Sequence, residues 1–170
     1  MYNERMKLTK QDLEYINTTL AKYYDHPEVR KMAGFVAHGK KSVLSHCIDV
    51  AHKAYLLNKK FNMHGNEEVL LVGALLHDFY LYDWHNRPLN KNIFKMHGFT
   101  HPETARVNAV KYFNVDKDIQ KVIKSHMWPL TLRSFPNSKE AFLVCMADKL
   151  CALKETVNRW LIYILYISQF

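Results

Sequence analysis

Hydrophobic residues recur every three or four positions along most of the chain, the spacing that places them on one face of an α-helix. Residues suited to cap a helix start, namely Thr9, Ser42, Asp116 and Ser138, stand just before these periodic stretches. The pattern predicts helices over 9–24, 27–34, 42–58, 66–79 and 117–127, one that begins at 100 with Pro102 in its first turn, and a long one over 138–166.

Three stretches interrupt this periodicity and are expected to be loops, at 35–41, 80–100 and 128–137. No segment shows the alternation of hydrophobic and polar residues that predicts a β-strand. With 170 residues, 48% of them hydrophobic, and no linker or repeat, the chain is expected to form one all-α domain, a helical bundle. The segment 66–79 is hydrophobic on nearly every side, so we expect it at the centre of that bundle.

The charge of the chain favours an anionic partner. It carries 24 Lys and Arg against 16 Asp and Glu, a formal net charge of +8. A small phosphate-containing substrate is the partner that this charge favours, and a solvated basic surface is the alternative. Nucleic-acid binding is not expected, because no helix is rich in arginine and lysine.

The cysteines and the chain ends bear on location. Cys47, Cys145 and Cys151 lie within apolar helical patterns and are expected to be reduced, buried thiols, as in the cytoplasm. The N-terminus lacks a signal-peptide stretch, and the apolar run 160–167 is much shorter than the ~20 residues that span a bilayer. We therefore expect no membrane partner. The run is expected to end a packed helix or to form a subunit contact, which leaves a homodimer open.

The pair His77-Asp78 directly follows the hydrophobic run of the central segment. An imidazole and a carboxylate are costly to bury unpaired, but together they are good ligands for a divalent metal. Further candidate ligands stand in or beside other predicted helices: His46, His101, His126 and Asp148. The sequence therefore predicts a helical enzyme built around a metal.

The order of His46, His77-Asp78 and Asp148 on predicted helices resembles the HD-domain superfamily of metal-dependent phosphohydrolases. The resemblance implies one HD-type domain over 1–170, with a metal-binding core at about 41–153 in which these four residues hold one ion. It also implies that the protein hydrolyses a small phosphate ester, with nucleotides among the candidates, by means of a metal-bound hydroxide.

The same resemblance implies a second ion. In the two-metal branch of the superfamily, two histidines come from the helices that follow the doublet, and His101 and His126 match those places. Asp78 would then bridge two ions ~3.5–4 Å apart. Iron or manganese is expected first, with magnesium, cobalt, nickel and zinc as alternatives. A one-metal pocket in which these histidines bind phosphate is a second interpretation, and His97 is an alternative to His101.

Departures from the family pattern narrow the chemistry. The cyclic-dinucleotide phosphodiesterases of the superfamily carry a Gly and a Lys after the doublet and a later Gly-Tyr-Pro, whereas here 79–84 follows the doublet and the tripeptide is absent. Cleavage of cyclic dinucleotides is therefore disfavoured. The single-metal nucleotidases have a glutamate where Leu81 stands here, so the usual candidate for activating water is missing and a metal-bridged hydroxide is favoured as the nucleophile, with Asp78 counted among the catalytic residues.

The remaining catalytic roles are expected to come from loops. The proton for the leaving group should come from the loop 80–100, and the substrate phosphate needs cationic partners. The proton-donor candidates are Asp83, His85, Lys95 and His97; the phosphate-binding candidates are Lys41, Arg87 and Lys95, followed by Arg133 and Lys149. Trp84 and Trp128 are expected to pack in the core or to stack on a substrate ring, and Asp49 either orients an imidazole or has a surface role.

Two other function classes stay open at this point. The six-ligand pattern also resembles the mixed-valence di-iron oxygenases of the superfamily, which cleave C–C or C–P bonds with O₂. A non-catalytic module that keeps metal for stability is the third hypothesis. Substrate-dependent oxygen uptake and metal analysis discriminate among these classes.

Overall fold

The computed structural model describes residues 7–37, 39–86 and 91–167, with side chains described as far as Val157. Within these residues the chain is helical and contains no β-strand, so the all-α prediction is confirmed. The elements are α1 (Lys10–Tyr24), α2 (Pro27–Arg30), η2 (Lys31–Gly34), α3 (Val43–Lys60), α4 (Glu67–Leu76), η3 (Ile93–Lys95), α5 (His97–Phe113), α6 (Lys117–Ser125) and α7 (Lys139–Ile167).

The central position predicted for the hydrophobic segment is confirmed. Helix α4 contacts α1, α3, α6 and α7, and all its residues from Val69 to Leu76 are buried. Gly73 allows α6 to approach closely, since a Cβ at this position would lie 2.6 Å from Val122 Cγ1. Helix α4 therefore lies at the centre of the bundle, and His77 and Asp78, which follow its C-terminal end, are buried in the interior.

Side-chain caps fix where several helices begin. Thr9 and Asp12 form a reciprocal capping box at the start of α1, and Ser42 accepts a hydrogen bond from the amide of Ser45 at the start of α3. Asp116 caps α6, and the Ser138 hydroxyl accepts from the amide of Ala141 at the start of α7. These starts agree with the starts predicted from the sequence.

Three predicted helix boundaries are wrong. Helix α4 ends at Leu76 instead of Phe79, so the His77-Asp78 pair lies just beyond its last turn. Helix α6 likewise ends at Ser125 instead of Met127. Helix α5 begins at His97, one turn before the predicted start, and Pro102 lies inside it. Because the amide that proline lacks would have bonded only to the carbonyl four residues earlier, the first turn of α5 forms without it.

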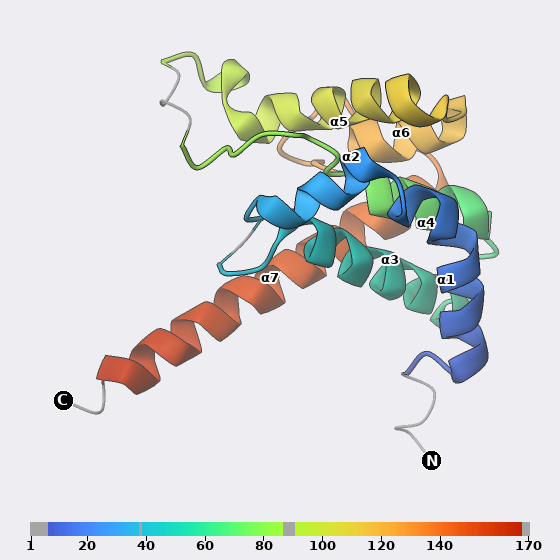
Figure 1. Cartoon of the computed structure of the whole chain (residues 1–170), viewed down its shortest axis with the longest axis horizontal. Coiled ribbons are helices and arrows are strands. Elements are labelled where there is room, and N and C mark those ends of the chain that lie inside the picture. Colours follow the sequence, from blue (N-terminus) through green and yellow to red (C-terminus); the bar gives the residue numbers. More distant parts are fainter. Residues whose placement is uncertain (1–6, 38, 87–90, 168–170) are drawn as a thin grey trace.

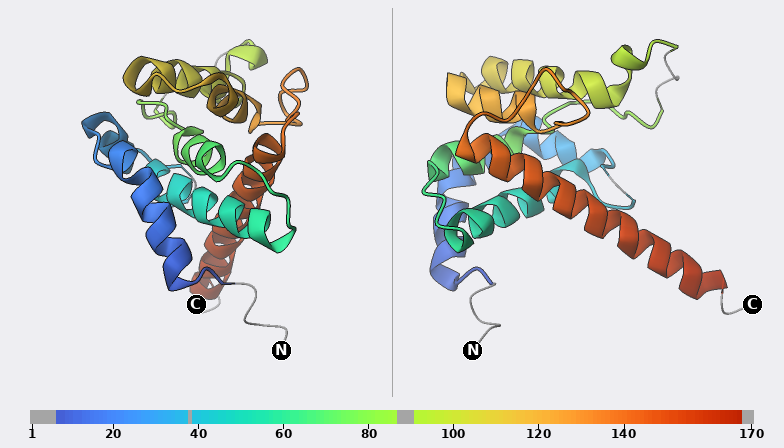
Figure 2. Two further views of the ribbon diagram at one scale, coloured as in Figure 1. Left: turned by 90° about the vertical axis from the view of Figure 1, so that its right-hand side faces the viewer. Right: turned by 180° about the vertical axis from the view of Figure 1, so that it is seen from behind.

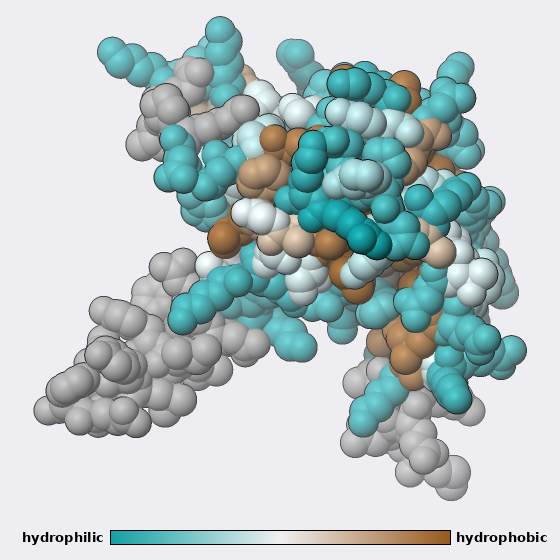
Figure 3. Space-filling model, viewed as in Figure 1, coloured by the Kyte–Doolittle hydropathy of each residue, from teal (hydrophilic) through white to brown (hydrophobic). Residues whose placement is uncertain are grey.

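The helices are arranged in layers, with α5 and α6 side by side above α4 and α7 crossing below them (Figure 1). Helix α7 packs against α3, α4 and α6, and its C-terminal part extends beyond the bundle, as both the front and rear views show (Figure 2). The face in Figure 3 is mostly hydrophilic, with smaller hydrophobic areas between the charged residues. None of the described helices is long and apolar enough to cross a membrane.

Candidate metal centre

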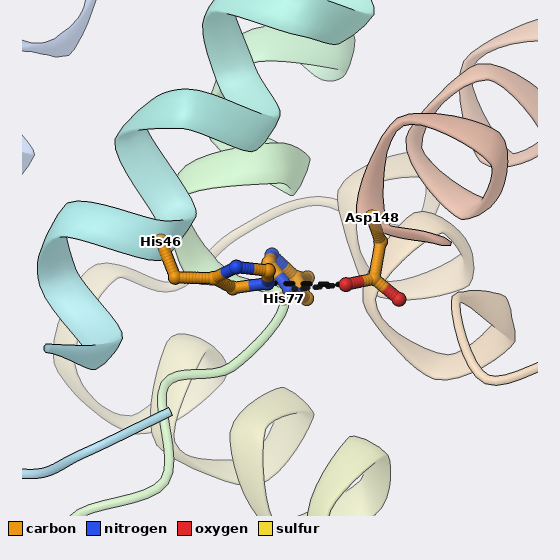
Figure 4. A group of neighbouring side chains, drawn as sticks. All are labelled: His46, His77 and Asp148. Atoms are coloured by element: carbon orange, nitrogen blue, oxygen red, sulfur yellow. Dashed lines mark hydrogen bonds and ion pairs between the residues drawn. The ribbon is translucent and has the colours of Figure 1, made fainter. Parts of the chain in front are cut away.

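Three helices bring His46, His77 and Asp148 to one point. His46 comes from the first turn of α3, His77 follows the end of α4, and Asp148 comes from α7. The Nε2 atoms of His46 and His77 lie 3.1 and 3.7 Å from Asp148 Oδ1 (Figure 4). All three residues are buried, and their ligand atoms lie within 4.8 Å of one another, close enough to share one ion.

A second group adjoins the first. His101 from α5 and His126 from the end of α6 lie with their Nε2 atoms 3.1 and 3.6 Å from Asp78 Oδ1. The two Nε2 atoms are themselves 2.8 Å apart. His77, Asp78 and His126 again have ligand atoms within 4.8 Å of one another. The structure thus brings together all six residues that the sequence analysis named as ligands, and His77 lies between the two groups.

The hydrogen bonds of the imidazoles show that these residues fit a metal. Each of His77, His101 and His126 donates its Nδ1 hydrogen to a backbone carbonyl, of Ala74, His97 and Ile123 respectively, at 2.7–2.8 Å. In the neutral ring the Nε2 atom then carries a lone pair and no hydrogen.

Lone pairs consequently face one another across the centre. The Nε2 of His101 faces both the Nε2 of His126 and Oδ1 of Asp78, although none of these atoms has a hydrogen to offer in that state. His77 Nε2 and Asp78 Oδ1 are buried and have no hydrogen-bond partner. Buried acceptors arranged in this way are costly unless a cation lies between them. The donor set of imidazole nitrogen and carboxylate oxygen suits a divalent transition metal.

Charge in the centre supports the same conclusion. Burial disfavours protonation of His46, but the carboxylates of Asp148 and Glu155 outweigh it and raise the pKa of His46 to about 10. Burial would raise the pKa of Asp148, yet the hydrogen bond with His46 and the nearby imidazole of His77 hold it well below its usual range. Burial and the neighbouring imidazoles of His77 and His101 lower the pKa of His126 to about 3. The His46 side therefore attracts positive charge strongly, and His126 keeps its lone pair.

Glu155 is a functional residue that the sequence analysis missed. Both of its carboxylate oxygens lie 3.2 Å from His46 Nδ1, and its side chain is only 10% exposed. A carboxylate behind a ligating imidazole fixes the ring and its tautomer, so that Nε2 faces the metal. Glu155 follows Asp148 by seven residues, two helical turns, and this spacing on one face of α7 was the available signal.

Lys41 lies on the Glu155 side of His46. Its ammonium pairs with Asp49 and lies 3.3 Å from Glu155 Oε1. These contacts direct the Lys41 side chain to the Nδ1 edge of the His46 ring, whereas Asp148 lies at the Nε2 edge. Lys41 therefore holds Glu155 in place, and Asp49 acts through Lys41 instead of bonding to an imidazole.

Two residues named in the sequence analysis, His97 and Trp84, stack next to the ligand candidate His101. His97 stacks on the ring of the ligand candidate His101, with ring centroids 4.5 Å apart, and the Tyr82 hydroxyl lies 3.0 Å from His97 Nδ1. Trp84 stacks in turn on His97, with ring centroids 4.9 Å apart. The Trp84 indole is thus already engaged with a histidine of the protein.

The remaining candidates are exposed, support the backbone of a ligand candidate, or lie outside the described residues. Asp83 is exposed and accepts hydrogen bonds from the His85 amide and from Asn86, and Lys95 is exposed in η3. Lys149 donates to the carbonyl oxygen of His126 at 2.8 Å, which supports the backbone of that ligand candidate. Arg87 lies outside the described residues.

A buried cluster of four histidines and two aspartates between helices defines a class of helical proteins that bind divalent metals. The family model for the HD domain matches residues 43–153, more than half of the chain. The chain belongs to the HD domain family, whose superfamily comprises metal-dependent hydrolases. Searches of curated proteins and of solved structures return no match for the chain.

Proposed function

We propose that this HD domain protein hydrolyses small phosphate esters, with nucleotides as the first class to test, and that it works with two divalent metal ions. The observation that carries the proposal is the pair of adjoining ligand groups, which meet at His77 and Asp78. A site that holds two adjacent ions would suit an in-line displacement at phosphorus, in which the attacking and the leaving oxygen both carry negative charge.

The residues have separate roles in this proposal. His46, His77 and Asp148 would hold one ion, and Asp78, His101 and His126 the other, with the Asp78 carboxylate shared between them. Bound divalent ions supply Lewis acidity, which lowers the pKa of a coordinated water and neutralises charge on phosphoryl oxygens. The protein contributes fixed ring orientations through the Nδ1 hydrogen bonds and a buried setting that strengthens the interaction with charge.

His97, which the sequence assigned to the loop and the structure places at the start of α5, is the candidate best placed to serve the leaving group. Among the loop candidates that the structure describes, His97 has the ring in contact with a ligand candidate, His101. Its Nδ1 is engaged by the Tyr82 hydroxyl, which orients the imidazole. Histidine is the side chain that most often transfers a proton to or from a reacting group in enzymes.

The overall charge and the cysteines support the substrate class and the compartment. A net charge of +8 favours the approach of an anionic ester. Cys47, Cys145 and Cys151 are buried free thiols, which supports a reducing compartment such as the cytoplasm.

The test is phosphate release from a panel of nucleoside monophosphates, sugar phosphates and an aryl phosphate, with protein loaded separately with Mn²⁺, Fe²⁺, Co²⁺ or Mg²⁺. Asp78→Asn should abolish turnover, and Asp118→Asn should not, because Asp118 is an exposed residue of α6 that pairs with Lys121. The proposal would be overturned if no metal supported phosphate release and the iron-loaded protein instead took up oxygen in a substrate-dependent way. That result would indicate oxygenase chemistry.

A further inference from the structure

Helix α7 exposes a row of hydrophobic side chains that the metal centre does not use. The row consists of Phe142, Met146, Leu150, Leu153 and Val157, which are 44, 38, 42, 61 and 45% exposed. Their spacing of three or four residues places them on one face of the helix. We refer to these five residues as the α7 stripe.

The opposite face of α7 is already hydrophobic and buried. Ala141, Val144, Ala147 and Cys151 are buried where the helix packs on α3, α4 and α6. A helix at the surface of a single domain normally has a polar outer face, whereas α7 is apolar on two opposite sides. A second hydrophobic face of this kind marks an interaction surface.

The length of α7 points to the same conclusion. The helix has 29 residues and is thus about 43 Å long. Its C-terminal part extends away from the other helices (Figures 1 and 2). The sequence of that part, 160–167, is apolar at every position. A helical segment of this composition that packs against nothing is only marginally stable in water, so this part of α7 needs a partner to pack against.

We propose that the partner is α7 of a second copy of this chain, packed antiparallel along the α7 stripe. The stripe is complementary to itself when reversed. A two-fold axis near Leu150 places the large Phe142 against the smaller Val157, and Met146 against Leu153. A parallel pairing would instead place each large residue against its own copy.

The antiparallel arrangement also covers other exposed hydrophobic residues. The extended end of one α7 runs past the start of the other, where the preceding loop exposes Leu132 and Phe135 by 76 and 60%. Leu150 also lines a groove of about 380 Å³ between α3 and α7, in which Leu8 and Leu56 lie beside charged residues such as Lys53 and Lys154, so the stripe adjoins a concave surface of mixed polarity. A stable interface needs about 800 Å² from each partner, which a helix of this length can supply.

The first experiment measures the mass of the purified full chain by light scattering at micromolar concentration. The wild type should run at twice the 20.1 kDa of one chain. The double variant Leu153→Glu/Val157→Glu should shift to the monomer mass. A matched control, Phe61→Glu/Val107→Glu, changes two residues that are 59 and 48% exposed on other elements and should remain dimeric. A monomeric wild type overturns the proposal.

Cysteine cross-linking then tests the pairing without depending on destabilised variants. Under mild oxidation Leu150→Cys should form a covalent dimer, because this position lies beside the two-fold axis. Val157→Cys alone should not, because its two copies would be about 22 Å apart, whereas a disulfide needs Cα atoms within about 7 Å. The wild type serves as background, since Cys47, Cys145 and Cys151 are buried. Efficient cross-linking of Val157→Cys, or none with Leu150→Cys, contradicts the antiparallel dimer.

Discussion

The His46 side of the metal centre and the His101–His126 side are held in place by different partners. His46 is held by the Glu155 carboxylate, which is itself paired with Lys41, a chain of charged groups between α3 and α7. His101 and His126 are held by the backbone carbonyls of His97 and Ile123, within their own helices α5 and α6. The orientation of His46 therefore depends on long-range ion pairs, whereas that of His101 and His126, like that of His77, depends on local helix geometry.

The two kinds of partner are expected to affect metal binding differently: one raises the affinity of the imidazole for the ion, and the other mainly sets the orientation of the ring. A carboxylate behind the imidazole makes it a stronger base and a better ligand, whereas a carbonyl mainly fixes its orientation. We therefore expect the His46 side to bind its ion more tightly. The His101–His126 side adjoins His97 and the loop candidates, and we expect it to face the substrate.

The largest effect is expected where the two sides meet. Asp78→Asn removes the carboxylate charge that both ions share, so metal content should fall sharply and phosphate release should drop at least about 10³-fold. Elemental analysis and initial rates measure both quantities. Retention of two ions by a folded Asp78→Asn protein would show that Asp78 does not join the two sides.

Replacing one histidine on each side, in separate variants, should show how the occupancy of each ion depends on its own side. His126→Ala should leave about one ion per chain on the His46 side, whereas His46→Ala should weaken the tighter site and thereby lower both occupancies. His52→Ala, a half-buried histidine of α3 outside both ligand groups, is the matched control. Equal losses from His126→Ala and His46→Ala, measured by metal titration, would contradict the proposed difference between the sides.

Glu155→Gln tests the charged chain behind His46 without touching a ligand. The amide keeps the shape but removes the charge, so we expect the affinity for the tighter ion to fall roughly 10–100-fold. Lys154→Gln changes the exposed neighbour and should leave the affinity as it is. Competition with a chelator of known affinity gives both values, and an unchanged Glu155→Gln would mean that the carboxylate has only a packing role.

The smallest expected effect is a difference between the two sides in how their metal affinity depends on pH. Since the pKa of His46 is raised to about 10, its imidazole holds a proton at neutral pH that metal binding must displace. Affinity on this side should rise with pH, by up to about tenfold per pH unit for one displaced proton. His126, with a pKa lowered to about 3, has no proton to release. Calorimetry in buffers of different ionisation enthalpy measures the protons released by each ion.

Much of the fold could be predicted because helix starts are encoded locally. Thr9, Ser42, Asp116 and Ser138 stand next to the helices that they begin, so local sequence was sufficient. The early start of α5 could not be predicted, because Pro102 normally belongs to a first turn. The surrounding structure allowed one more turn before it.

The ligand candidates could be predicted from the sequence, whereas the residues that support them could not. The six ligand candidates could be named because histidine and aspartate in apolar helices are unusual and follow the family order. Glu155 and Lys41 lie 109 and five residues from His46 in the sequence, and glutamate and lysine are common on helix surfaces. Their contact with one another and with His46 exists only after α3 and α7 have packed together.

Anomalous X-ray scattering from crystals of the manganese-loaded protein would locate the ions. Two peaks are expected, one bordered by His46, His77 and Asp148 and the other by Asp78, His101 and His126. A single peak, or ions bound elsewhere with these six side chains left uncoordinated, would contradict the two-metal proposal.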